Sequence, residues 1–160
     1  MITFTVLDKC KKERWLPVLF DIFYDNMRHI VPSQLPYEQE KRQWLSEVSP
    51  ALEKAPRQII LCFADGVFAG YVQYYTNKNL LMIEEIQIKQ AYQRTTLFYC
   101  IGKYLARILP PELETVEAFA VKQNLHSRRL MQRLGMSQID EDSNFVHLRG
   151  SVQKVRQFFK

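Results

Sequence analysis

The sequence lacks paired cysteines, long apolar runs and blocks of like charge, and each absence excludes a class of protein. Cys10, Cys62 and Cys100 are far apart and form no CxxC pair, which argues against a disulfide framework and a cysteine-based metal site. No apolar run approaches the roughly 20 residues that cross a bilayer, so we expect no membrane partner. The basic residues are scattered, so the net charge of +5 does not indicate a nucleic-acid partner.

The first residues also lack the order of a signal peptide, in which basic residues precede a long apolar stretch. We therefore expect a cytoplasmic protein. With 160 residues, of which 47% are hydrophobic and 24% charged, the chain is expected to form a single domain, 1–160, with its own core.

Hydrophobic periodicity predicts an alternation of strands and helices. An Asp65-Gly66 pair between two β-rich runs predicts a hairpin, because both central residues of that turn need positive φ. Three consecutive strands precede a helix, strand and helix, which implies an α+β fold: a mixed central sheet of about seven strands with helices on both faces. The predicted strands are 2–6, 59–64, 67–75, 80–88, 115–121, 136–139 and 145–149, and the predicted helices are 11–30, 37–52, 94–109, 124–134 and 150–160. Pro17 is expected only in a first helical turn, and Pro50 is expected to disturb its helix.

Two segments carry a more specific signal. Residues 86–98 read as a strand, a short loop and a turn patterned Q/R-x-x-G-x-G/A, in which Gln93 fits the first position. Thr96 and Phe98 stand where small residues are usual. Residues 124–136 are similar to N-x-x-A-x-x-x-Y-x-x-x-G-F, with Asn124 at the first position and Met131 in place of the tyrosine. In this order the two segments resemble the GNAT superfamily of N-acetyltransferases.

The resemblance implies a three-layer GNAT-like domain that transfers an acetyl group from acetyl-CoA, its co-substrate, to an amine of a small molecule or protein. The reaction would be a direct attack within a ternary complex, by a monomer or a homodimer. The implied cofactor-binding residues lie along the pantetheine arm, at the pyrophosphate or on the following helix; they are Ile86, Gln87, Ile88, Gln93, Arg94, Thr95, Thr96, Leu97, Phe98, Asn124 and Met131.

The turn before the helix at 94–109 is the expected phosphate site, because a helix N-terminus offers free N–H groups and a positive dipole end. We expect helical φ through this turn, which residues with side chains can adopt. Arg94 would add a charge-assisted contact. Thr95 and Thr96 have two interpretations, hydroxyl donors to the phosphates or helix capping without a ligand.

The resemblance also implies a carboxylate base on the strand at 80–88, since an attacking amine must lose a proton. Glu84 and Glu85 are the candidates, and alternation places one on each side of the sheet; the alternative is a pair of solvated acids. Met131 cannot donate a proton to the leaving thiolate. Tyr74, Tyr75 and His147 are candidates for that role, although each also fits a structural role. No metal is expected.

Met131 and the missing glycines support an alternative function, a catalytically impaired acyl-CoA-binding module or protein-interaction module. In the second case Phe98 would fill the path of the phosphates.

Overall fold

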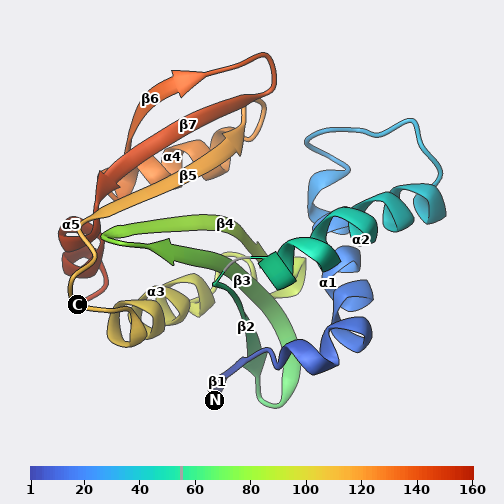
Figure 1. Cartoon of the computed structure of the whole chain (residues 1–160), viewed down its shortest axis with the longest axis horizontal. Coiled ribbons are helices and arrows are strands. Elements are labelled where there is room, and N and C mark those ends of the chain that lie inside the picture. The colour runs from blue at the N-terminus through green and yellow to red at the C-terminus, as the bar shows by residue number, and fades with distance from the viewer. Residues whose placement is uncertain (55) are drawn as a thin grey trace. The chain divides into compact units, whose positions relative to one another are not determined.

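The computed structural model describes residues 1–54 and 56–160, and within them the chain forms a seven-stranded mixed sheet and five α-helices. The strand order is β1-β2-β3-β4-β5-β7-β6 (Figure 1), which confirms the α+β fold class. The strands are β1 (Ile2–Val6), β2 (Arg57–Ala64), β3 (Val67–Asn77), β4 (Leu80–Ile88), β5 (Thr115–Val121), β6 (Ser137–Glu141) and β7 (Phe145–Ser151). The helices are α1 (Lys12–Met27), α2 (Tyr37–Lys54), α3 (Leu97–Ile108), α4 (Leu125–Arg133) and α5 (Val152–Phe158), and two 3₁₀ turns are η1 (Lys9–Lys11) and η2 (Gln90–Tyr92).

The chain divides into two compact units. The first contains Met1–Gln73 and Glu85–Arg94, and the second contains Tyr74–Glu84 and Thr95–Lys160. Strands β3 and β4 contribute residues to both units. That the 160 residues act as a single domain stays a prediction.

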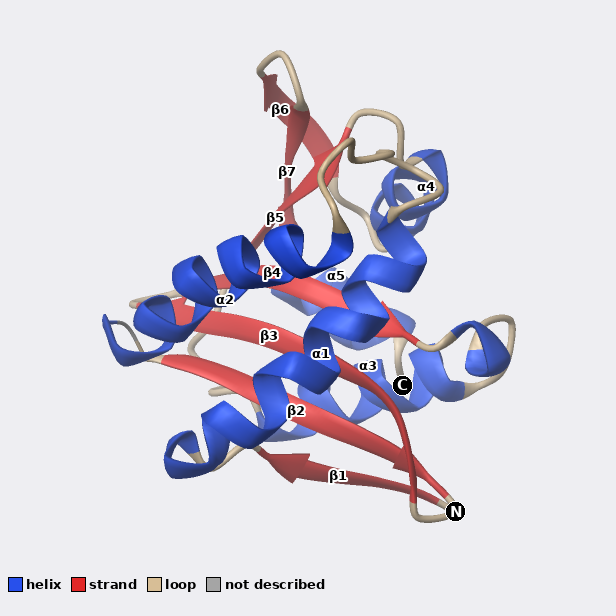
Figure 2. Cartoon of the chain, turned by 90° about the vertical axis from the view of Figure 1, so that its right-hand side faces the viewer, coloured by secondary structure: helices blue, strands red, loops and turns tan. Residues whose placement is uncertain are grey.

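In the first unit, α1 and α2 lie over one face of β1, β2 and β3 (Figure 2). Two predictions about prolines were wrong: Pro17 lies beyond the first turn of α1, and α2 continues through Pro50. Each proline removes one helical hydrogen bond, and packing of the apolar face against the sheet offsets that loss. The buried core consists of Leu7, Leu16, Leu19, Ile22, Leu52, Ile59, Leu61 and Tyr71.

The hairpin between β2 and β3 forms as predicted. Asp65 and Gly66 have φ of 48° and 79°, which is the left-handed pair that such a turn requires. Farther along β3, a Cβ added to Gly70 would lie 2.5 Å from the carbonyl oxygen of Gln87. This position therefore requires glycine, because the neighbouring atom belongs to the backbone of β4 and cannot move aside.

In the second unit, β4 pairs in parallel with β5 from Leu80–Thr115 to Ile83–Ala118. Strand β5 also pairs antiparallel with β7, from Thr115–Ser151 to Val121–Phe145. Helix α4 covers one face of β5 and β7, and no helix of this unit covers their other face among the described residues (Figures 1 and 2). Helix α3 begins at Leu97 rather than Arg94.

Candidate functional site

In the first unit, three side-chain amides meet at the end of β4, and we call Asn26, Gln87 and Gln93 the amide cluster. The Asn26 amide donates to Gln87 Oε1 at 3.0 Å and to the Ile88 carbonyl at 2.9 Å. The Gln93 amide donates to Asn26 Oδ1 at 3.1 Å and to the same carbonyl at 3.0 Å. Gln87 in turn donates to Glu85 Oε2 at 2.8 Å. Both amide hydrogens of Gln93 are thus used inside the protein.

Asn26 was missing from the residues that the sequence assigned to the site. The helical spacing could have indicated Asn26, because it lies on the same apolar face of the first helix as Ile22 and Phe23. A polar residue on an apolar helical stripe is informative, because a buried amide needs partners. Here those partners are the end of β4 and the loop before α3.

Glu85 lies on the side of β4 that faces α1. It shares that side with Gln87, because alternate residues of a strand point the same way, whereas Glu84 lies on the other. Nearby, Tyr71 is fully buried in the core, and its hydroxyl has no hydrogen-bond partner among the described residues. Burial raises the pKa of Tyr71 well above its ordinary value, and the charge of Glu85 adds to this. The charge of the Glu85 carboxylate on β4 is therefore close enough to act on the buried hydroxyl of Tyr71 on β3.

The turn that opens α3 departs from the expected helical backbone at Arg94, whose φ is 62°. After it, Thr95 Oγ1 accepts a hydrogen bond from the Leu97 amide at 3.2 Å. The Cys100 amide donates to the Thr96 carbonyl at 3.0 Å, and this bond closes the first turn of the helix. The amides that precede it have no intrahelical acceptor.

The two bulky side chains of this turn pack within the second unit. Leu97 is 1% exposed. The Phe98 ring lies 5.7 Å from the ring of Phe159, and Phe159 is itself buried. In contrast, Arg94, Thr95 and Thr96 are exposed. The surface of the helix start is therefore formed by polar side chains.

Three residues of β5 and β7 form a second cluster, and we call Glu117, His147 and Arg149 the charged cluster. Glu117 is 7% exposed and accepts a hydrogen bond from Arg149 Nε at 2.7 Å on Oε1. His147 Nε2 lies 3.6 Å from the other oxygen, Oε2, and the exposed ring of Phe119 stacks on the imidazole with centroids 4.2 Å apart. The cluster and Phe119 share one face of β5 and β7, because Glu117 pairs with Arg149, Phe119 pairs with His147 and alternate residues of a strand point the same way.

Asn124 and Met131 belong to α4. Asn124 Oδ1 accepts a hydrogen bond from the Ser127 amide at 3.1 Å and so caps the helix as predicted. Gly135 follows the helix with φ of 88°, the conformation expected of a C-terminal capping residue. Met131 is buried. The segment 124–136 therefore builds a capped helix.

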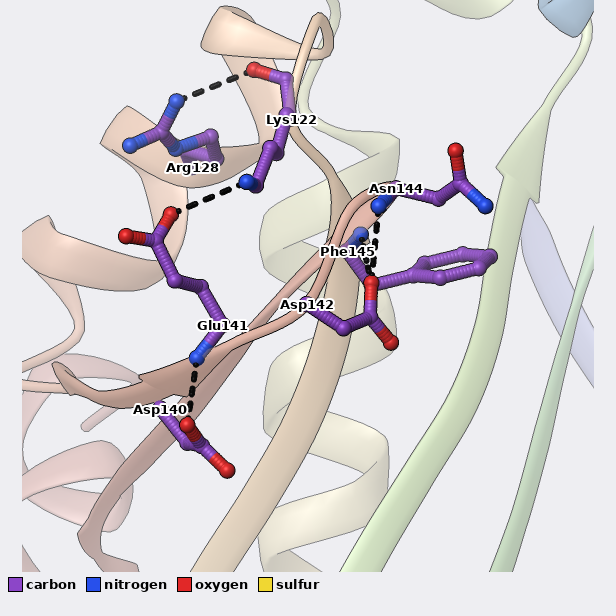
Figure 3. A network of polar contacts seen from close by, with 7 residues as sticks. All are labelled: Lys122, Arg128, Asp140, Glu141, Asp142, Asn144 and Phe145. Atoms are coloured by element: carbon purple, nitrogen blue, oxygen red, sulfur yellow. Dashed lines mark hydrogen bonds and ion pairs between the residues drawn. The ribbon is translucent and has the colours of Figure 1, made fainter.

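Polar contacts connect the loop after β5 with α4 and with the end of β6, and others form the turn before β7 (Figure 3). Lys122 Nζ lies 3.1 Å from Glu141 Oε2, and the Lys122 carbonyl accepts a hydrogen bond from Arg128 at 2.9 Å. Asp142 Oδ1 accepts hydrogen bonds from the amides of Phe145 and Asn144, each at 2.7 Å. These two bonds hold the pKa of Asp142 below its ordinary value. They fix the turn between β6 and β7.

The structure thus groups the predicted site residues by unit. Glu85, Gln87 and Gln93 are joined in the first unit, whereas Asn124 and Met131 lie on a helix of the second. Among residues 1–54 and 56–160 no three His, Cys, Asp or Glu side chains are grouped as metal ligands would be. In the same residues no helix has the length and apolarity needed to cross a membrane.

The protein resembles known proteins in its structure rather than in its sequence. No protein-family model matches the sequence, and no curated protein matches it. The PaiA N-acetyltransferase of Thermoplasma acidophilum, in complex with coenzyme A, shares 14% identity over 94% of this chain and 99% of its own, with a TM-score of 0.68. An acetyltransferase of Thermus thermophilus shares 15% identity over 94% of this chain and 97% of its own, with a TM-score of 0.72.

The Campylobacter jejuni N-acetyltransferase PseH, in complex with acetyl coenzyme A, shares 16% identity over 94% of this chain and 99% of its own, with a TM-score of 0.59. All three matches extend over nearly the whole chain. The chain has the fold of the GNAT acetyltransferases, as the two segments at 86–98 and 124–136 predicted.

Proposed function

We propose that this protein is an acetyl-CoA-dependent N-acetyltransferase that acts on a primary amine of a small molecule or protein. Its fold is shared with N-acetyltransferases, and two of the similar structures are complexes with coenzyme A or acetyl coenzyme A. The observation that carries the proposal is the start of α3, where amides without an intrahelical acceptor are combined with apolar side chains that pack within the second unit. A pyrophosphate needs several convergent donors, and a helix N-terminus supplies them.

The phosphates bind to the amides of Thr96, Phe98 and Tyr99 in this proposal. Arg94 adds a charge-assisted contact. Thr95 stabilises the turn, because its hydroxyl oxygen accepts a hydrogen bond from the Leu97 amide. Gln93 acts indirectly, because its side chain holds the loop that leads into the turn.

The pantetheine arm then extends back along β4. The ladder between β4 and β5 ends at Ile83 and Ala118, whereas β4 continues to Ile88. The Ile88 carbonyl already accepts two hydrogen bonds, so contacts to the arm fall to the backbone of Ile86 and Gln87. The acyl end lies farthest from the phosphates, toward the end of the ladder.

Glu85 is the base in this proposal, and Glu84 is the alternative. The amine gives up a proton to the carboxylate, directly or through a water molecule. The nitrogen lone pair forms a bond to the carbonyl carbon, the carbon–sulfur bond breaks, and the electron pair leaves with the CoA thiolate. The hydrogen bond from Gln87 fixes the orientation of the Glu85 carboxylate.

Two measurements on the intact chain test this function. Acetyl-CoA should raise the melting temperature, and acetylpantetheine, which lacks the pyrophosphate, should raise it much less at equal concentration. Release of free thiol is then measured with polyamines, aminosugars and lysine peptides as acceptors. With an active acceptor, E85Q should lower kcat by about 100-fold, while the matched variant E84Q should change it by less than about threefold.

A second function, binding of acyl-CoA without catalysis, is supported by Met131, because a thioether cannot protonate a leaving thiolate. It predicts the same rise in melting temperature with no thiol release for any acceptor. The absence of any shift with acetyl-CoA would contradict both functions.

A further inference from the structure

The charged cluster contains a histidine with the environment of an acid–base group. The imidazole of His147 has one nitrogen, Nε2, that is fully buried, lacks a hydrogen bond among the described residues and lies 3.6 Å from Glu117 Oε2. At this distance the two groups can form an ion pair, but they are too far apart for a hydrogen bond. Such contacts are often long in the absence of substrate and shorten in the reacting complex.

The neighbours of the imidazole fix its orientation. Phe119 stacks on it with an interplanar angle of 18°. Arg149 binds Oε1 of Glu117, which leaves Oε2 to face the histidine. An N–H at Nε2 pointing to this oxygen would leave Nδ1 as the nitrogen that is not directed at Glu117. The side chain is 21% exposed.

The position of the cluster along β5 connects it to the proposed reaction. Glu117 and Phe119 flank Ala118, where the ladder between β4 and β5 ends. In the proposed function the acyl end of the arm reaches this point. The sulfur that leaves there needs a proton, and Met131 cannot supply one.

We propose that His147 is the general acid that protonates the departing CoA thiolate, with Glu117 as the residue that positions it. This inference rests on the proposed acetyl transfer. As the carbon–sulfur bond breaks, the electron pair stays on sulfur, which takes the proton from Nδ1 of the imidazolium. The Glu117 carboxylate stabilises the charged imidazolium through Nε2–H. The neutral imidazole then regains a proton from solvent.

The test compares two acyl donors. With acetyl-CoA the leaving thiolate is basic, whereas with the 4-nitrophenyl thioester of acetic acid it is stable without a proton. H147Q keeps a donor toward Glu117 but cannot transfer a proton. It should lower kcat with acetyl-CoA by about 100-fold, and lower the rate with the activated thioester by less than about threefold.

The controls separate this role from others. H126Q changes an exposed histidine on α4 and should leave both rates unchanged. E85Q should slow both donors, because the base acts on the amine. E117Q should lower kcat with acetyl-CoA and leave KM unchanged, as expected of a residue that positions the acid.

Each outcome decides the inference. Equal loss with both donors in H147Q, or no loss with acetyl-CoA, overturns the role of His147 while the acetyltransferase function stands. If the wild-type protein releases no thiol with any acceptor, the proposed function fails, and this inference fails with it. Selective loss with acetyl-CoA supports both.

Discussion

The two clusters hold their units together by different means. The amide cluster is neutral, and Asn26 joins α1, the end of β4 and the loop before α3 through three bonds of 2.9 to 3.1 Å. The charged cluster joins two strands through one buried carboxylate and a half-exposed Arg149. Neutral hydrogen bonds are little affected by salt, whereas an ion pair with an exposed partner is screened. The stability that the charged cluster contributes should therefore depend on salt, and that of the amide cluster should not.

The largest expected effect is the loss of Asn26. N26A leaves the Ile88 carbonyl and both glutamine side chains short of partners, which should lower the free energy of unfolding by about 2 kcal/mol. The matched variant Q90A removes only an exposed bond of 3.4 Å to the Asp25 carbonyl and should change stability by less than about 0.5 kcal/mol. Urea denaturation measures both. Equal losses in the free energy of unfolding for N26A and Q90A would show that the amide cluster stabilises the fold no more than an exposed hydrogen bond does.

The next effect is that of R149A, which leaves Glu117 buried without its cation. We expect a loss of about 1.5 kcal/mol at low salt. Between about 0.05 M and about 0.5 M NaCl the difference between wild type and R149A should shrink, because salt screens the intact pair. The difference between wild type and N26A should stay constant over the same range. A salt dependence of similar size in both variants would remove the contrast between the clusters.

Y71F sharpens the comparison within the first unit, where the amide cluster is hydrogen-bonded and the buried Tyr71 hydroxyl has no partner among the described residues. Because a buried hydroxyl without a partner is costly, Y71F should raise the free energy of unfolding by about 1 kcal/mol. Thermal and urea unfolding should agree on the sign. A loss of stability would mean that the hydroxyl makes a hydrogen bond in solution, through a buried water molecule for example.

The smallest effect is expected at Asp142, whose pKa is held down by the amides of Phe145 and Asn144. A lowered pKa in the folded state means that the ionised form stabilises the fold. That contribution is complete above the ordinary pKa of an aspartate and is lost as the pH falls through the lowered value. The melting temperature of the wild type should exceed that of D142N at pH 7. A gap that persists at low pH would contradict this account.

Periodicity and turn chemistry predicted most of the fold, because the signals are local. The Asp65-Gly66 hairpin, the Asn124 cap and the Gly135 helix end each depend on a few neighbouring residues. Pro17 and Pro50 were misjudged because tertiary packing offsets a local cost. The start of α3 moved for a similar reason: Arg94 adopts a left-handed φ, which its own side chain does not signal.

The candidate site was less predictable, because its contacts join distant parts of the chain. The strand and turn from Glu85 to Phe98 carried a recognisable pattern. Nothing in the sequence indicated that Gln93 would bond to Asn26, or that Glu117 would face His147 across two strands. The second pairing depends on the register of β5 and β7, which a single sequence does not encode in any short motif. The roles assigned to Glu84, Glu85 and the cofactor-binding residues stay predictions.

Asn26 also has a mechanical consequence. One side chain near the end of α1 links that helix rigidly to the last residue of β4 and to the segment that feeds the next helix. A displacement of α1 would therefore move Ile88 and Gln93 together. The first unit therefore couples the position of α1 to that of the loop before α3.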